Sequence, residues 1–170
     1  MVTKRTLVGQ IGLIPGANGW VDWTIEKVTK SPVHHVVVCV SATECIGAEP
    51  GGARIRPMSD FPEAIWSHFP FTPTQRKGVA GWAYAHEGTP YSLLDDFVIG
   101  LSLLSGIRTP QWAERRLSRT DRMICSQLAD AALTLGGGIR VFGDDREFGA
   151  VYPGSFVPYF KEHGWWPEND

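Results

Sequence analysis

Cys125 is the residue of this sequence best placed for nucleophilic chemistry. It opens the segment 125–135 (CSQLADAALTL), whose apolar residues recur at helical spacing. At the start of a helix, a thiol lies near backbone N–H groups without intrahelical acceptors and near the positive end of the helix dipole. Both favour the thiolate. The sequence therefore indicates Cys125 as a candidate nucleophile. The alternative is a small buried side chain at a helix start.

A histidine pair, His34 and His35, directly precedes the apolar run VVVCV and supplies a candidate base. Alternation along a strand predicts that the two rings lie on opposite faces, so at most one shares a site with Cys125. A cysteine–histidine pair also needs a third polar group that orients the imidazole. Glu44 and Glu49 are candidates for this group, although Glu49 also precedes a PGG turn and a role beside that turn is equally expected.

The elements that would position these residues are β-rich in the first part of the chain and helical in the second. We expect strands at 7–14, 31–40 and 44–49, another short strand ending at Pro57, and one near 140–142. Helices are expected at 20–30, 72–86, 92–104, 111–117 and 125–135, the last stopped by the glycines at 136–138. A turn is expected at Pro153 and Gly154, holding the C-terminal segment against the sheet. The predicted fold is α+β, a small antiparallel sheet packed against helices, in a single domain over 1–170.

Composition narrows the classes of function. The sequence has 16 Lys and Arg residues against 18 Asp and Glu residues. It therefore lacks the excess of positive charge that is typical of nucleic-acid-binding proteins. No run of about 18 apolar residues occurs, so no integral membrane segment is expected. The three cysteines lack metal-type spacing, so no metal or cofactor is predicted. Without a recognisable signal peptide, we expect a cytoplasmic protein with free thiols. The sequence makes no prediction of oligomeric state.

Four strings, in this order, resemble the permuted branch of the NlpC-type papain-like superfamily, which includes the YiiX-like enzymes. They are SPVHHVVVCV, IGAEPGGARIRP, GTPYSLLD and MICSQLADAAL. The resemblance implies a circularly permuted papain-like fold and a thiol hydrolase that cleaves amide bonds in peptidoglycan or another peptide. It assigns Cys125 as nucleophile and His35 as base, and it implies Tyr91 and Ser126 as substrate-binding residues. For Tyr91, packing is the alternative. A phage protein of this type would be released at lysis or carried in the virion.

The sequence departs from the family at the group that orients the histidine. Where relatives carry a glutamate in the second strand, this chain has Gly47, and Glu49 lies two residues on, about 6–7 Å further along the strand. Glu49 is therefore expected to reach back through the space that the glycine vacates. The alternatives are a water molecule, Ser41 or Thr43. The departure also leaves open a catalytically impaired protein with a binding or virion structural role. A lipid acyl hydrolase or acyltransferase is a third possibility.

Overall fold

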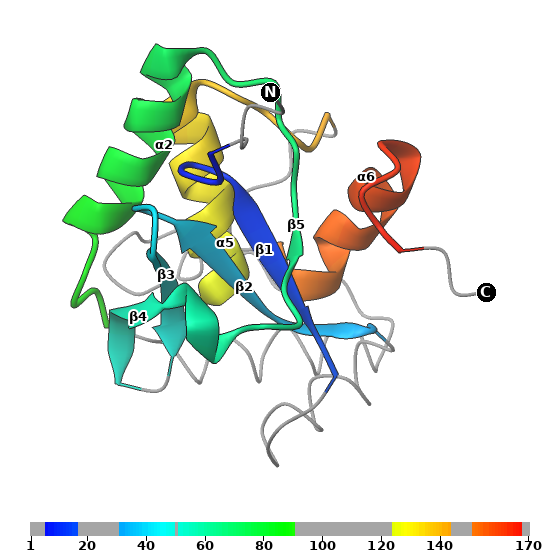
Figure 1. The fold of residues 1–170 in the computed structure, drawn as a ribbon, viewed down its shortest axis with the longest axis horizontal. Helices are drawn as coiled ribbons and strands as arrows, with labels where there is room; N and C mark the ends of the chain where they lie inside the picture. Colours follow the sequence, from blue (N-terminus) through cyan, green and yellow to red (C-terminus); the bar gives the residue numbers. More distant parts are fainter. Residues whose placement is uncertain (1–5, 17–30, 50, 91–123, 144–150, 168–170) are drawn as a thin grey trace, which may run out of the picture.

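The computed structural model describes residues 6–16, 31–49, 51–90, 124–143 and 151–167. Its strands are β1 (Ile11–Pro15), β2 (Val33–Cys39), β3 (Glu44–Glu49), β4 (Gly52–Pro57) and β5 (Ile65–Trp66). They form one antiparallel sheet in the order β4-β3-β2-β1-β5. The described α-helices are α2 (Pro73–Ala85), α5 (Cys125–Ala131) and α6 (Val157–Glu162). Figure 1 shows α5 lying across the sheet beside β2. The predicted α+β class, with an antiparallel sheet packed against helices, is confirmed.

The hairpin β3–β4 has the bounds that the sequence predicts. Its ladder runs without a break from Glu44 opposite Pro57 to Glu49 opposite Gly52. At the turn, Gly51 and Gly52 adopt φ values of 101° and 118°, which side-chain-bearing residues rarely adopt. The PGG sequence thus ends β3 and begins β4. β1 is shorter than the predicted strand 7–14, and the two-residue strand β5 was not predicted, because its pattern is too short to stand out.

The two faces of the sheet are covered differently. Alternate residues of the strands, such as Val36, Val38, Ile46 and Ala48, belong to the main core together with the buried side of α5. The opposite face carries a smaller cluster of Ile14, Val37 and Cys45, against which Met58, Phe61, Ala64 and Trp66 pack. Helix α5 therefore covers one face, and the segment that leads to β5 covers part of the other.

Helix α2 begins at the residue that the sequence predicts as its start. The Thr72 hydroxyl accepts a hydrogen bond from the Gln75 backbone N–H at 3.2 Å, and the Gln75 side-chain oxygen accepts one from the Thr72 N–H at 3.0 Å. Pro73 occupies the first helical position, where its missing N–H costs nothing. This reciprocal cap fixes where the chain turns from the sheet into α2.

The helical run that starts at Cys125 continues past α5 as a π-helical segment, η2 (Ala132–Gly136). Gly138 follows with φ 66° and ends the run, as the glycine run predicts. Helix α2 crosses η2 at a pair of glycines. A Cβ added to Gly78 would collide with the backbone carbonyl of Gly136, so the two backbones approach more closely than any side chain permits.

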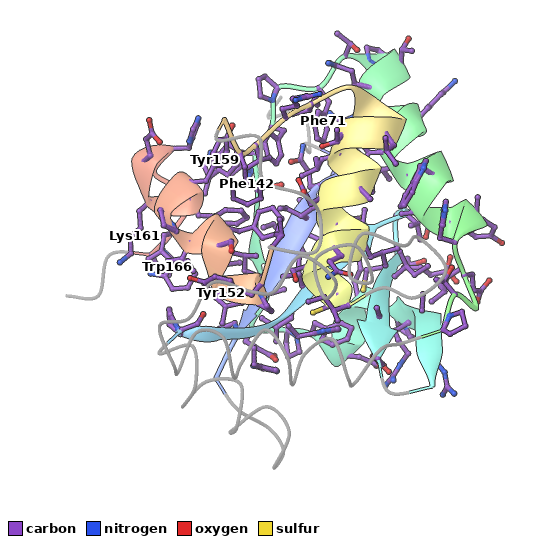
Figure 2. The ribbon with its side chains drawn as sticks, turned by 180° about the vertical axis from the view of Figure 1, so that it is seen from behind. Phe71, Phe142, Tyr152, Tyr159, Lys161 and Trp166 are labelled. Atoms are coloured by element: carbon purple, nitrogen blue, oxygen red, sulfur yellow. The ribbon has the colours of Figure 1, made fainter. Side chains whose placement is uncertain are left out.

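The C-terminal part differs from its prediction. Residues 140–142 form no strand, because Val141 and Phe142 pack individually against the core instead of pairing with a neighbouring strand. Pro153 and Gly154 begin a 3-10 helix, η4 (Pro153–Phe156), which leads into α6, a helix that was not predicted. The predicted contact with the sheet is present, since η4 contacts β2. Figure 2 shows Phe142 and Tyr159 on the side of α6 that faces α5, with Lys161 on its far side.

The helices predicted at 20–30, 92–104 and 111–117 lie outside the described residues, as does Tyr91. Among the residues that are described, no helix has the length and apolar character needed to cross a bilayer.

Candidate active site

The site of interest lies where β2 and β3 part. Their ladder comprises only Val38 opposite Ile46 and Cys39 opposite Cys45, whereas the β3–β4 ladder continues to Glu49. The halves of β2 and β3 that hold His35 and Gly47 are therefore not paired through their backbones. Helix α5 contacts both strands. Ile14, which is paired with His35, and Phe61, which packs on its ring, belong to the smaller cluster, whereas Cys125 belongs to the main core on the other face. A reaction between Cys125 and His35 would therefore have to take place through the part of the sheet in which β2 and β3 are not paired.

A register shift in β2 brings the two histidines together. Ile14 of β1 pairs with His35, but the next residue, Pro15, pairs with Val33, so His34 is the extra residue of a bulge. The ring centroids of His34 and His35 are 6.5 Å apart, with planes inclined by only 22°. The expectation of opposite faces is wrong here, because the bulge interrupts the alternation on which it rests.

His35 lies against β3. A Cβ built on Gly47 would be 2.7 Å from Nε2 of His35 and 3.1 Å from a methyl carbon of Val37. The ring also packs on Phe61, with 5.9 Å between the two ring centroids. The His35 residue is partly exposed, but its Nε2 is shielded from solvent and makes no hydrogen bond with the described residues. Burial, followed by the charges of His34 and Arg56, lowers the pKa of His35 from 6.5 to about 4. The ring is therefore neutral at neutral pH.

Glu49, the group expected to orient this ring, is engaged elsewhere. Its carboxylate lies 3.3 Å from Nη1 of Arg56, whose Nη2 lies 2.9 Å from Asp60. The space above Gly47, through which Glu49 was expected to reach, is filled by the His35 ring itself. In the described part of the chain, the ring packs against β3 and Phe61.

The hairpin link between β2 and β3 is also excluded as the source of the orienting group. The Ser41 hydroxyl donates to Glu44 at 3.0 Å, and the backbone oxygen of Thr43 accepts from the N–H of Met58 at 2.8 Å. Ser41 is six residues from His35 along β2, or about 20 Å in an extended chain. A side chain as short as serine or threonine cannot span that distance.

Cys125 is the first residue of α5, as predicted, and it is buried in the main core. The N–H groups of the first turn have no intrahelical acceptors, as at any helix start. Ser126 is fully buried, and its hydroxyl donates to the Val151 carbonyl at 2.7 Å. That bond ties the segment before η4 to α5. The expectation that Ser126 binds substrate is therefore not supported by its position.

Gln127 is a candidate that the sequence reasoning did not single out. Its side chain is buried, and its oxygen accepts a hydrogen bond from the Ile124 N–H at 3.3 Å. This bond places the carboxamide at the start of α5. Among the described residues, the amide nitrogen, Nε2, has no hydrogen-bond partner, so it is a buried donor that could serve a bound acceptor. The sequence signal was available, since a glutamine in the first turn folds back onto the helix start.

The described residues contain no group of three His, Cys, Asp or Glu side chains that could hold a metal ion. A comparison of the sequence with protein-family models finds no match, and a comparison with curated proteins finds no similar sequence.

Proposed function

We propose that this chain is a thiol hydrolase that cleaves amide bonds, with Cys125 as nucleophile and His35 as base. The observation that carries the proposal is the state of His35. Its Nε2 is buried without a hydrogen-bond partner among the described residues, on the stretch of β2 that is not paired with β3. A neutral imidazole with an unengaged nitrogen is the form that accepts a thiol proton, and the pKa of about 4 makes this ring a weaker base than an ordinary histidine.

In the proposed reaction, His35 takes the proton of Cys125 and the thiolate attacks the acyl carbon of the amide. The tetrahedral intermediate collapses to a thioester as His35 returns the proton to the leaving amine. A water molecule, deprotonated by His35, then hydrolyses the thioester and regenerates the thiol. The backbone N–H of Cys125 and the Nε2 of Gln127 are the donors available to the oxyanion, because both lie at the start of α5.

The finer assignment, a permuted papain-like fold acting on peptidoglycan stem peptides, is part of the same proposal. The order of the elements supports it, since the histidine-bearing strand and its hairpin come first and the cysteine helix follows. The feature that favours a catalytically impaired binding protein instead is that no carboxylate of the described residues contacts His35. Packing of the ring against Gly47 and Phe61 offers another means of orienting it.

The test compares the purified chain with Cys125→Ser and His35→Ala on two substrate panels, muropeptides and acyl esters. We expect release of amines from muropeptides, and a loss of at least about 1,000-fold in each variant. The matched control is His163→Ala, since His163 is an exposed histidine on the last turn of the chain's final helix. Activity confined to the acyl esters would replace amide hydrolysis with lipid acyl chemistry. Full activity of Cys125→Ser would overturn the mechanism.

Alkylation by iodoacetamide at neutral pH gives a second, substrate-free test. Burial raises the pKa of Cys39 to about 11 and that of Cys45 to about 12, so both thiols are expected to react slowly in the folded protein. Fast alkylation confined to Cys125, identified by peptide mapping, supports a nucleophile. Equal and slow labelling of all three cysteines, together with inactivity on both panels, would leave a binding protein.

A further inference from the structure

The glycine at position 47 is not required by its backbone. Among the described glycines, seven adopt a positive φ, and Gly47 is not one of them. It lies inside β3, paired with Arg54 of β4, where glycine is usually unfavourable because it loses more entropy than other residues and packs no side chain. Some other feature must account for the absence of a side chain at this position.

That feature is the imidazole of His35. The two atoms closest to a Cβ at position 47 both belong to this ring, Nε2 at 2.7 Å and Cε1 at 3.0 Å, and Val37 follows at 3.1 Å. Real Cβ atoms essentially never approach another atom to 2.7 Å, so any side chain at position 47 must push the ring away. The position of the His35 ring therefore depends on the absence of a side chain at position 47.

We propose that Gly47 is a positioning residue, whose missing side chain allows the His35 imidazole to lie against β3 in the opening between β2 and β3. Because Glu49 is held by Arg56 and does not reach the imidazole, this packing fixes where Nε2 lies. The role of Gly47 in catalysis rests on the proposed function, but the effect of position 47 on the ring does not.

The charged groups that act on the ring come from two strands. They are His34 of β2 and Arg56 of β4, and Arg56 is already paired with Glu49 and Asp60. Gly47→Ala changes none of these charges. A change in the titration of His35 in this variant therefore reports a displaced ring and altered burial, and not an altered set of neighbours.

The experiment follows the Cε1 proton of His35 by NMR during a pH titration of the full chain, in the wild type, Gly47→Ala and the control Gly81→Ala. A Cβ on Gly81 meets no atom within 4 Å. We expect the pKa of His35 to rise from about 4 towards 6.5 in Gly47→Ala, because the displaced ring gains solvent, and to stay unchanged in the control. An identical titration in the wild type and Gly47→Ala would overturn the proposal, whatever the enzymatic activity.

A double variant keeps the test decisive should Gly47→Ala fold poorly. Removing the ring in His35→Ala takes away the two atoms nearest to the new Cβ and leaves the Val37 methyl carbon at 3.1 Å. Gly47→Ala should then lower the urea midpoint less in the His35→Ala background than in the wild type. An equal lowering in both backgrounds would show that the ring is not what the glycine accommodates.

Activity separates this inference from the proposed function. If the chain is a thiol hydrolase, Gly47→Ala should lower kcat about 100-fold with a small change in KM, because an ångström of displacement of a catalytic group costs about that much. It should also move the acid limb of kcat/KM to higher pH. An inactive wild type would refute the proposed function, while the NMR titration would still decide the role of Gly47.

Discussion

Glu49 and Arg56 are joined across the β3–β4 hairpin, with 3.3 Å between Oε2 and Nη1. Glu49, the carboxylate nearest in sequence to position 47, is thus held by a guanidinium. Arg56 is itself fixed by Asp60 at 2.9 Å. The histidine and the glutamate that the sequence assigns to one catalytic group belong, in the structure, to two separate groups.

Glu49→Gln is therefore expected to leave hydrolysis within about threefold of the wild type, far from the roughly 10⁴-fold loss that follows removal of an orienting carboxylate. The unfolding free energy should fall by no more than about 1 kcal/mol, because the ion pair is partly exposed to solvent. Steady-state kinetics and urea unfolding at neutral pH check both values. A 100-fold loss of kcat in a folded variant would return Glu49 to the catalytic group.

The pKa of His35 predicts how stability depends on pH. The folded pKa, about 4, lies below the ordinary value of 6.5, so the unfolded chain binds a proton more readily between these two values. The contribution of the neutral ring is fully present above pH 6.5, decreases as the pH falls from 6.5 to 4, and is absent below. The difference between the two pKa values corresponds to at most about 3 kcal/mol.

Urea unfolding of the wild type and His35→Gln at pH 7 and pH 4.5 measures this contribution. The wild type should lose more stability on acidification than the variant, which lacks the titrating ring, while the other acid groups contribute equally to both proteins. Equal losses would mean that His35 titrates normally, and the neutral, buried state that supports the proposed base would then be wrong.

The sequence predicts local features well where a single residue type determines them. The glycine turn before β4 and the start of α5 at Cys125 each follow from the chemistry of a few neighbouring residues. The strand predicted at 140–142 failed because a β-favouring composition does not provide a partner strand, and pairing is decided by the rest of the fold.

The candidate site depends on relationships that no local pattern contains. Alternation assigned His34 and His35 to opposite faces, but the bulge opposite Ile14 and Pro15 arises from the pairing of β2 with β1, a strand more than fifteen residues away. The contact between Gly47 and the His35 ring likewise needs the register of two strands. By the family resemblance, Gly47 stands where a glutamate would orient the histidine. In the structure, the missing side chain at this position leaves room for the His35 ring.

Gln127 provides a prediction that separates catalysis from helix capping. Gln127→Glu keeps an oxygen that can accept the hydrogen bond from the Ile124 N–H but removes the unpaired amide donor. If Nε2 donates to the oxyanion, this variant should lose about 100-fold or more in kcat with KM nearly unchanged. Gln127→Met, which adds no buried charge, should lose a similar factor. Retention of kcat in Gln127→Glu would restrict the residue to capping α5.

The glycine crossing of α2 and η2 gives the sharpest prediction for stability. A Cβ on Gly78 meets the carbonyl of Gly136, a backbone atom that cannot move aside without shifting the helical run that begins with Cys125. Gly78→Ala should therefore destabilise the protein by about 2 kcal/mol or more, in the range of overpacked cores. Alanine is otherwise the better helix former by about 1 kcal/mol.

The control is Gly81→Ala, three residues along the same helix, where a Cβ has open space around it. This substitution should raise the free energy of unfolding or leave it unchanged. Urea unfolding of both variants measures the contrast. Equal effects of the two substitutions would mean that α2 and η2 do not meet backbone to backbone at Gly78, and α5 would then lack the support that holds Cys125 against the sheet.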